Sequence, residues 1–228
     1  LYSNSTGNGN TAVGDYALYD NTTGIANVAV GGWDGTTVSA LRENTTGSNN
    51  VAMGVGANES NETSNDNVAV GYKALFANTA SDIVGVGNSA LGSNTTGLRN
   101  TAVGHRALAN NTTGGYNTAV GRHALTNNTT ADYNVAVGNY ALDLSTGEGN
   151  TALGYNAGGI VSTGYENVMV GSRAGEAVTT GHKNILIGHD AGGAITTGAK
   201  NVVIGYDAAI FEGNDLTTGE NCTLIGSY

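Results

Sequence analysis

The chain has 228 residues, and its composition is unlike that of an ordinary enzyme domain. It contains 37 Gly, no Pro and only 11% charged residues, whereas a typical globular chain has about 7% Gly and about 25% charged residues. The net charge of −10 argues against nucleic acid or an anionic membrane surface as a partner. No apolar run approaches the roughly 20 residues that span a bilayer, so we expect no membrane insertion. The single cysteine, Cys222, excludes an intrachain disulfide framework and a cysteine-rich metal site.

One repeated phrase organises the chain from end to end. Asn-Thr-Ala-Val-Gly at 10–14 returns as Asn-Val-Ala-Val-Gly at 27–31 and as Asn-Ile-Leu-Ile-Gly at 184–188. Its thirteen copies, most of them 17 residues apart, close at Gly14, Gly31, Gly54, Gly71, Gly87, Gly104, Gly121, Gly138, Gly154, Gly171, Gly188, Gly205 and Gly226. Because Leu1 already lies within a repeat, and neither a signal peptide nor an initiator methionine precedes it, we expect the chain to be a segment of a longer protein.

The period is too short for the helix pairs of α-solenoids, which repeat every ~33 to 47 residues. Each repeat also holds several Gly, Asn and Thr residues, which disfavour helix interiors. The phrase itself alternates like a β-strand and is bounded by Asn and Gly. We therefore predict an all-β fold, a repetitive parallel β-solenoid or β-roll with coils of about 17 residues, each made of a strand, a turn, a short second strand and a turn.

The strands are apolar on both faces. The β-branched residue after each Asn and the aliphatic residue before each Gly share one face, and the residue between them, usually Ala, points the other way. Strands of this kind are buried on both faces, yet a thin roll has one interior, so we expect copies side by side in a homotrimeric fibre. We place Val103 and Val120 in the core column, where Val103→Asp would bury an unpaired charge and cost several kcal/mol.

A volume exchange divides the chain into two regions. The middle residue of the phrase grows from Ala to Met at Met169, and just before that the Leu of a second phrase, as in Leu142, shrinks to Gly, as in Gly158. Since close-packed interiors conserve volume, we expect these two columns to touch. Residues 1–150 form the Ala-Leu type of repeat and 151–228 the Ala-Gly type, within one continuous solenoid.

The recurrent Asn and Gly have structural explanations. Asn100 and Asn117 fit turns and can form a ladder of stacked amides, while Gly104 and Gly121 fit positions of positive φ or close backbone approach. The chain also carries many Asn-x-Ser/Thr sequons. We expect turn chemistry rather than a glycan to explain them at Asn21, Asn44, Asn94, Asn111 and Asn128.

The search for chemistry is nearly empty. No zinc-protease helix motif, phosphate-binding loop or serine-hydrolase elbow occurs, and we predict no catalytic, cofactor-binding or metal-binding residue and no enzyme activity. A ring of symmetry-related His in an oligomer is an alternative metal site, but we expect exposed turn positions for His105, His123, His182 and His189. Glu59, Glu62 and Asp66 could hold a cation weakly, but we expect a solvated loop.

Departures from the repeat indicate surface features. The second copy carries six extra residues within 32–42, including Trp33, and the twelfth carries four around 209–216, including Phe211. Insertions in solenoids map to surface loops, often on a binding face. With Tyr72, Tyr155 and Tyr206, which directly follow a closing glycine, these aromatics are candidates for stacking on sugar rings; the alternative is that they cover the edges of the roll.

The pattern Asn-Thr-Ala-Val-Gly-x-x-Ala-Leu-x-x-Asn-Thr-Thr-Gly at 100–114 resembles repeats of bacteriophage tail-fibre-like proteins and related bacterial surface proteins. It is also similar to the head repeat of trimeric autotransporter adhesins, a left-handed parallel β-roll, although those repeats are shorter, near fourteen residues, and place Ser after the Asn. The resemblance covers essentially the whole chain. It implies a homotrimer on a virion surface or an extracellular cell surface, a role in attachment, and no catalytic residues.

These observations favour a structural and adhesive fibre segment of a viral (phage) tail fibre or spike that mediates attachment to a host through a cell-surface glycan or receptor. The close alternative is the head of a bacterial trimeric surface adhesin. An ice-binding β-solenoid would fit the Thr content, but its threonines should form Thr-x-Thr arrays, and here the paired threonines are adjacent. A polysaccharide-cleaving spike enzyme would need clustered carboxylates, which the spacing within one chain does not give.

Overall fold

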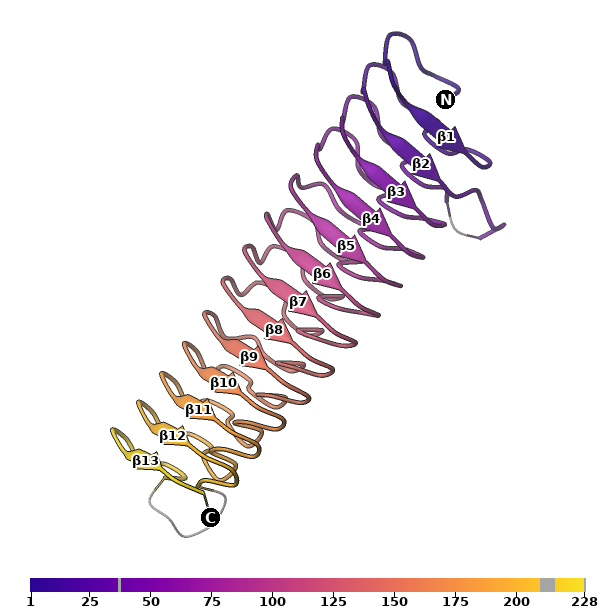
Figure 1. Cartoon of the computed structure of the whole chain (residues 1–228). Coiled ribbons are helices and arrows are strands. Elements are labelled where there is room, and N and C mark those ends of the chain that lie inside the picture. Colours follow the sequence, from indigo (N-terminus) through magenta and orange to yellow (C-terminus); the bar gives the residue numbers. More distant parts are fainter. Residues whose placement is uncertain (37, 210–215, 228) are drawn as a thin grey trace. The chain divides into compact units, whose positions relative to one another are not determined.

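The computed structural model describes residues 1–36, 38–209 and 216–227, and it confirms an all-β parallel solenoid with coils of about 17 residues (Figure 1). The described part of the chain contains no helix, and each coil contributes one strand of three residues. The strands are β1 (Thr11–Val13), β2 (Val28–Val30), β3 (Val51–Met53), β4 (Val68–Val70), β5 (Val84–Val86), β6 (Thr101–Val103), β7 (Thr118–Val120), β8 (Val135–Val137), β9 (Thr151–Leu153), β10 (Val168–Val170), β11 (Ile185–Ile187), β12 (Val202–Ile204) and β13 (Thr223–Ile225).

The chain divides into two units. Unit 1, Leu1–Tyr116, holds β1 to β6, and unit 2, Asn117–Tyr228, holds β7 to β13. Within each unit every strand pairs in parallel with the next one in the sequence, and equivalent residues of the repeat face each other, as in Ala29↔Ala52. The change of repeat type near residue 150 lies inside unit 2. There β8 and β9 pair without interruption, so the change alters side-chain packing but not the ladder.

The middle residue of each strand points into the coil. Ala102 of β6 and Ala136 of β8 are fully buried, whereas Val103 and Val120, placed in the core column by the sequence, are each 37% exposed in the single chain. The placement of Val103 and Val120 in the interior of the coil was therefore wrong. Larger side chains of the opposite wall already fill that interior, so the strand has room there for little more than a methyl group. Val103→Asp would therefore put its charge on the outer face.

The opposite wall is built by the leucines of the second phrase, and it is not the expected second strand. Leu75, Leu108 and Leu142 adopt φ of 54°, 51° and 50°, in the left-handed region, which costs an L residue about 1–2 kcal/mol. The segment is therefore a turn. Complete burial of these leucines offsets the backbone cost, since burying such a side chain contributes about 1.5–3 kcal/mol.

The predicted contact between the two columns is confirmed. A Cβ built on Gly158 would lie 2.8 Å from Met169 Sδ, and one built on Gly192 would lie 2.8 Å from Leu186 Cδ2. In unit 1 the large side chain stands on the opposite wall and the small one on the strand. A Cβ on Gly85 of β5 would lie 3.0 Å from Leu75 Cγ. A large side chain on the strand thus requires a small one on the opposite wall.

The predicted amide ladder is also confirmed, at the Asn that precedes eleven of the thirteen described strands. The Asn184 backbone N–H donates to Asn167 Oδ1 (3.0 Å), and Asn167 Nδ2 donates to the Gly181 carbonyl (2.8 Å). Asn100 and Asn117 occupy the same column and are fully buried. Each amide therefore satisfies two backbone groups of the next coil that would otherwise be buried without partners.

A second ladder runs through the sequons. Asn44 Nδ2 donates to Asn21 Oδ1 in the preceding coil, and Asn61 Nδ2 donates to Asn44 Oδ1, both at 2.8 Å. All five sequon asparagines singled out in the sequence are fully buried: Asn21, Asn44, Asn94, Asn111 and Asn128. Their amides lie inside the folded chain, which leaves no access for a glycan, so the turn interpretation holds.

The closing glycines are required by close backbone approach. Gly121 has a φ of 137°, and a Cβ built on it would lie 2.4 Å from the Gly138 carbonyl oxygen of the next coil. Gly104 has a φ of 138°, and its carbonyl oxygen would lie 2.4 Å from a Cβ on Gly87. Any side chain in this column would force neighbouring coils apart.

Candidate functional site

The outer face of the described strands is free of charge and mostly aliphatic, with a threonine in five of the strands, and the single chain leaves it half-buried to exposed. Its two columns are the residues on either side of the middle residue, and no Asp, Glu, Lys or Arg occurs in the thirteen strands of the described part of the chain. In unit 1, Val13 is 57% exposed and Met53 45%; in unit 2, Leu153 is 49% and Ile187 37% exposed. Soluble monomers rarely expose continuous apolar patches of more than a few hundred Å², and such patches mark interaction sites.

The register of the sheet makes each column straight. Val168 faces Ile185 and Val170 faces Ile187 across β10 and β11, and the same in-register pairing recurs between successive strands within each unit. Neighbouring parallel strands lie about 4.8 Å apart. The result in each unit is a regular apolar strip suited to packing against another surface of the same period.

Trp33, one of the predicted aromatic contact residues, lines a hollow of the described surface. Its side chain is 55% exposed and packs edge-to-face on Tyr16, with ring centroids 6.4 Å apart and an interplanar angle of 88°. Together with Val38 and Arg42 the two rings line a shallow hollow in unit 1. Exposed aromatic rings beside a guanidinium group can stack on and hydrogen-bond a sugar.

The other predicted aromatics do not gather into one site. Tyr72, Tyr155 and Tyr206 are 41%, 56% and 58% exposed. Tyr72 belongs to unit 1, while Tyr155 and Tyr206 follow β9 and β12 and are three coils apart in unit 2. Phe211 lies outside the described residues.

Side-chain stacks between successive turns were not predicted from the sequence. Tyr165 stacks on His182 with ring centroids 4.7 Å apart, and Lys183 Nζ lies 5.8 Å from the centroid of the Tyr165 ring. Lys183 also pairs with Glu166 (3.5 Å). Residues 17 positions apart lie one above the other, so the period itself could have shown these contacts.

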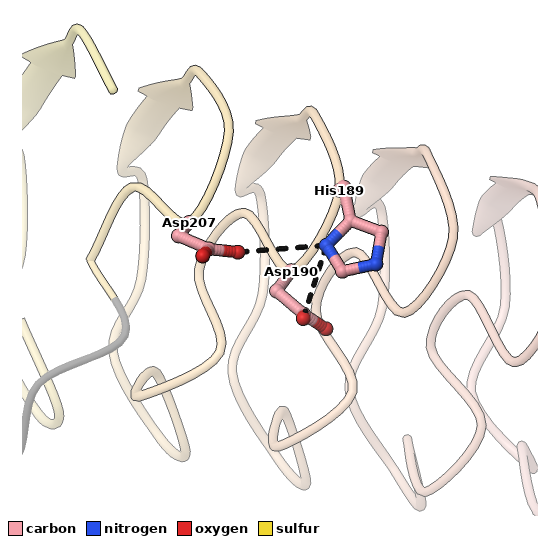
Figure 2. Close-up of side chains that lie close together, drawn as sticks. All are labelled: His189, Asp190 and Asp207. Atoms are coloured by element: carbon pink, nitrogen blue, oxygen red, sulfur yellow. Dashed lines mark hydrogen bonds and ion pairs between the residues drawn. The ribbon is translucent and has the colours of Figure 1, made fainter. Parts of the chain in front are cut away.

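One cluster of metal-ligand type was missed in the same way. His189 Nδ1 lies 3.1 Å from Asp190 Oδ2 and 3.4 Å from Asp207 Oδ1, on the turns that follow β11 and β12 (Figure 2). Within its own repeat, His189 is predicted only as an exposed turn residue. Asp207, however, is 17 residues after Asp190, and this spacing brings both carboxylates to the same imidazole.

The acidic patch of the third and fourth coils is only partly the solvated loop that we expected. Glu62 and Asp66 are exposed, but Glu59 is only 6% exposed. Desolvation by burial raises the pKa of Glu59, and the negative charge of Glu43 raises it further, against a lowering by the hydrogen bond that Ser60 Oγ donates to Glu59 Oε2 (3.0 Å). The expectation of a solvated loop is therefore wrong for Glu59, because the fold buries its side chain.

No protein-family model, curated protein or solved structure matches this chain. Among the described residues, no helix is long and apolar enough to cross a membrane.

Proposed function

We propose that the chain is a segment of a homotrimeric extracellular fibre, of the phage tail-fibre or spike type, that helps a virion attach to the surface of its host cell. The observation that supports this proposal most strongly is the apolar outer face of the strands. A shaft or head made of parallel copies would bury that face along its whole length. The head of a bacterial trimeric adhesin would use the same features and remains the alternative.

Self-association is favoured by the distribution of charge. The chain has a net charge of −10, and the strands that the structure describes contain no charged residue. Copies that pack strand face to strand face would keep like charges at the periphery and bury aliphatic groups, at a gain of about 25 cal/mol per Å² of apolar surface. A stable interface needs about 800 Å² per partner, and a strip that repeats at every coil supplies such area in proportion to its length.

Attachment to a glycan is supported by the hollow beside Trp33. The segment that carries the six extra residues, where the repeat departs from its period, supplies Trp33 and Arg42, and Tyr16 of the preceding coil supplies the second aromatic ring. Aromatic faces recognise the C–H face of a sugar, and a guanidinium group binds hydroxyl or carboxylate oxygens. We place the contact with the cell surface there.

Two measurements test the proposal. Light scattering after size exclusion should give about three times the chain mass of 22.8 kDa, and a mass of one chain at all concentrations would contradict the trimer. Immobilised lipopolysaccharide and capsular polysaccharide should retain the labelled protein, and Trp33→Ala should abolish retention without changing the mass. The matched control is Tyr133→Ala, which removes a 61% exposed ring from another turn and should bind normally.

A further inference from the structure

We propose that His189, Asp190 and Asp207 form a binding site for a divalent transition-metal ion of the zinc type. The imidazole nitrogen lies 3.1 Å from one carboxylate oxygen and 3.4 Å from the other, and the three ligand atoms all lie within 4.8 Å of one another (Figure 2). Ligands held at about 2.0–2.1 Å from a tetrahedral ion are separated by about 3.3–3.4 Å. An ion can therefore be accommodated with only small side-chain rotations.

The first carboxylate is held in position by contacts outside the site. Asp190 Oδ1 forms an ion pair with Arg173, whose Nε lies 3.0 Å away, and Arg173 Nε donates a hydrogen bond to Glu176 Oε2 (2.6 Å). This leaves Asp190 Oδ2 directed at His189. Metal sites characteristically orient their ligands through such outer partners.

The imidazole is oriented as well. The ring of His189 stacks on Tyr206 of the next coil, with centroids 5.2 Å apart and an interplanar angle of 15°. The Asp207 backbone N–H donates to the His189 carbonyl (2.9 Å). The pairing of the two coils thus fixes the backbones at His189 and Asp207 relative to each other, and the stack on Tyr206 orients the His189 ring.

The donor set indicates the class of ion. An imidazole nitrogen with two carboxylate oxygens suits Zn²⁺ and its neighbours in the first transition row, whereas Mg²⁺ and Ca²⁺ prefer oxygen ligands alone. Three protein ligands leave a fourth tetrahedral position for water or for an oxygen or nitrogen atom of a bound partner. The alternative is an ion-pair network that stabilises the turns without a metal.

The repeat provides a matched control. His105 occupies the position equivalent to His189, directly after the closing glycine, but it is followed by Arg106 in place of an aspartate. A cation would be repelled at that place and attracted at His189. Adventitious zinc binding to exposed histidines would not distinguish the two residues.

The test is calorimetric titration of the metal-free protein with Zn²⁺, with folding monitored by circular dichroism. We expect one site per chain, at least a tenfold loss of affinity in His189→Ala and in the nearly isosteric Asp207→Asn, and no change in His105→Ala. Co²⁺ as a second probe should give the intense visible absorption of a tetrahedral site, lost in both site variants. Equal binding by wild type and His189→Ala, or equal losses in His189→Ala and His105→Ala, would overturn the proposal.

Discussion

Met169 fills the space that a side chain at Gly175 would need: a Cβ on Gly175 would lie 2.7 Å from the Met169 sulfur. The same relation holds on the other side of Met169, at Gly158. The interior of each coil thus has a fixed volume that strand and opposite wall share, and this relation explains why one repeat type replaces the other.

Met169→Ala should therefore open a cavity between two glycines and lower the free energy of unfolding by about 2–5 kcal/mol. Adding Gly158→Leu should recover part of the loss, because it recreates the Ala-Leu combination and because Leu142 already adopts the required conformation, with a φ of 50°. Urea unfolding of the single and double variants measures both effects. A double variant no more stable than Met169→Ala would contradict the shared volume.

Asn167→Ala should be among the most damaging substitutions outside the apolar interior. It removes the acceptor of the Asn184 backbone N–H and the donor to the Gly181 carbonyl, both in buried surroundings. An unsatisfied buried group costs about 1–3 kcal/mol, so the loss of two should lower the free energy of unfolding by about 2–6 kcal/mol. Asn8→Ala, at an exposed position, is the control and should change stability little.

Asn58→Leu should stabilise the protein. Asn58 occupies the leucine column with a φ of 49°, identical to that of Leu41, and it is fully buried. Neither Nδ2 nor Oδ1 of Asn58 has a hydrogen-bond partner. Replacing these buried polar atoms with a side chain that the column accepts elsewhere should raise the free energy of unfolding by about 1–3 kcal/mol. A lower melting temperature in the variant would show that the polar side chain has a role there.

Glu59 should make stability depend on pH. Its pKa is raised in the folded chain above the ordinary value of 4.5, so the folded state retains the proton longer than the unfolded state. The contribution of Glu59 to the free energy of unfolding is therefore greatest at low pH. It falls as the pH rises from about 4.5 through the raised pKa. Glu59→Gln should remove this component, so its advantage in melting temperature over wild type should grow between pH 4 and pH 7. A constant difference across that range would count against the burial of the charge.

The repeat predicted the fold because its period, its Asn and Gly boundaries and its short β pattern all agree. The repeat did not predict which face of the strand lies inside the coil, because Thr101 and Val103 are as compatible with a core as Ala102 is. The buried leucines of the opposite wall determine that Ala102 points inward. The His189 cluster was missed because it combines residues from two coils, and each looks like an ordinary turn residue within its own repeat. Asn58 was missed because its unsatisfied amide depends on the three-dimensional packing around it.

Ala102 and Val103 are adjacent in β6, and the account assigns one to the interior of the coil and the other to a face covered by copies of the chain. The decisive measurement is the light-scattering mass of Val103→Asp, with circular dichroism of Val103→Asp and Ala102→Asp alongside. Val103→Asp should retain the β signal and give the mass of one chain, 22.8 kDa, while Ala102→Asp should lose the folded signal. A Val103→Asp protein with unchanged oligomeric mass, or an Ala102→Asp protein that folds normally, would contradict the account.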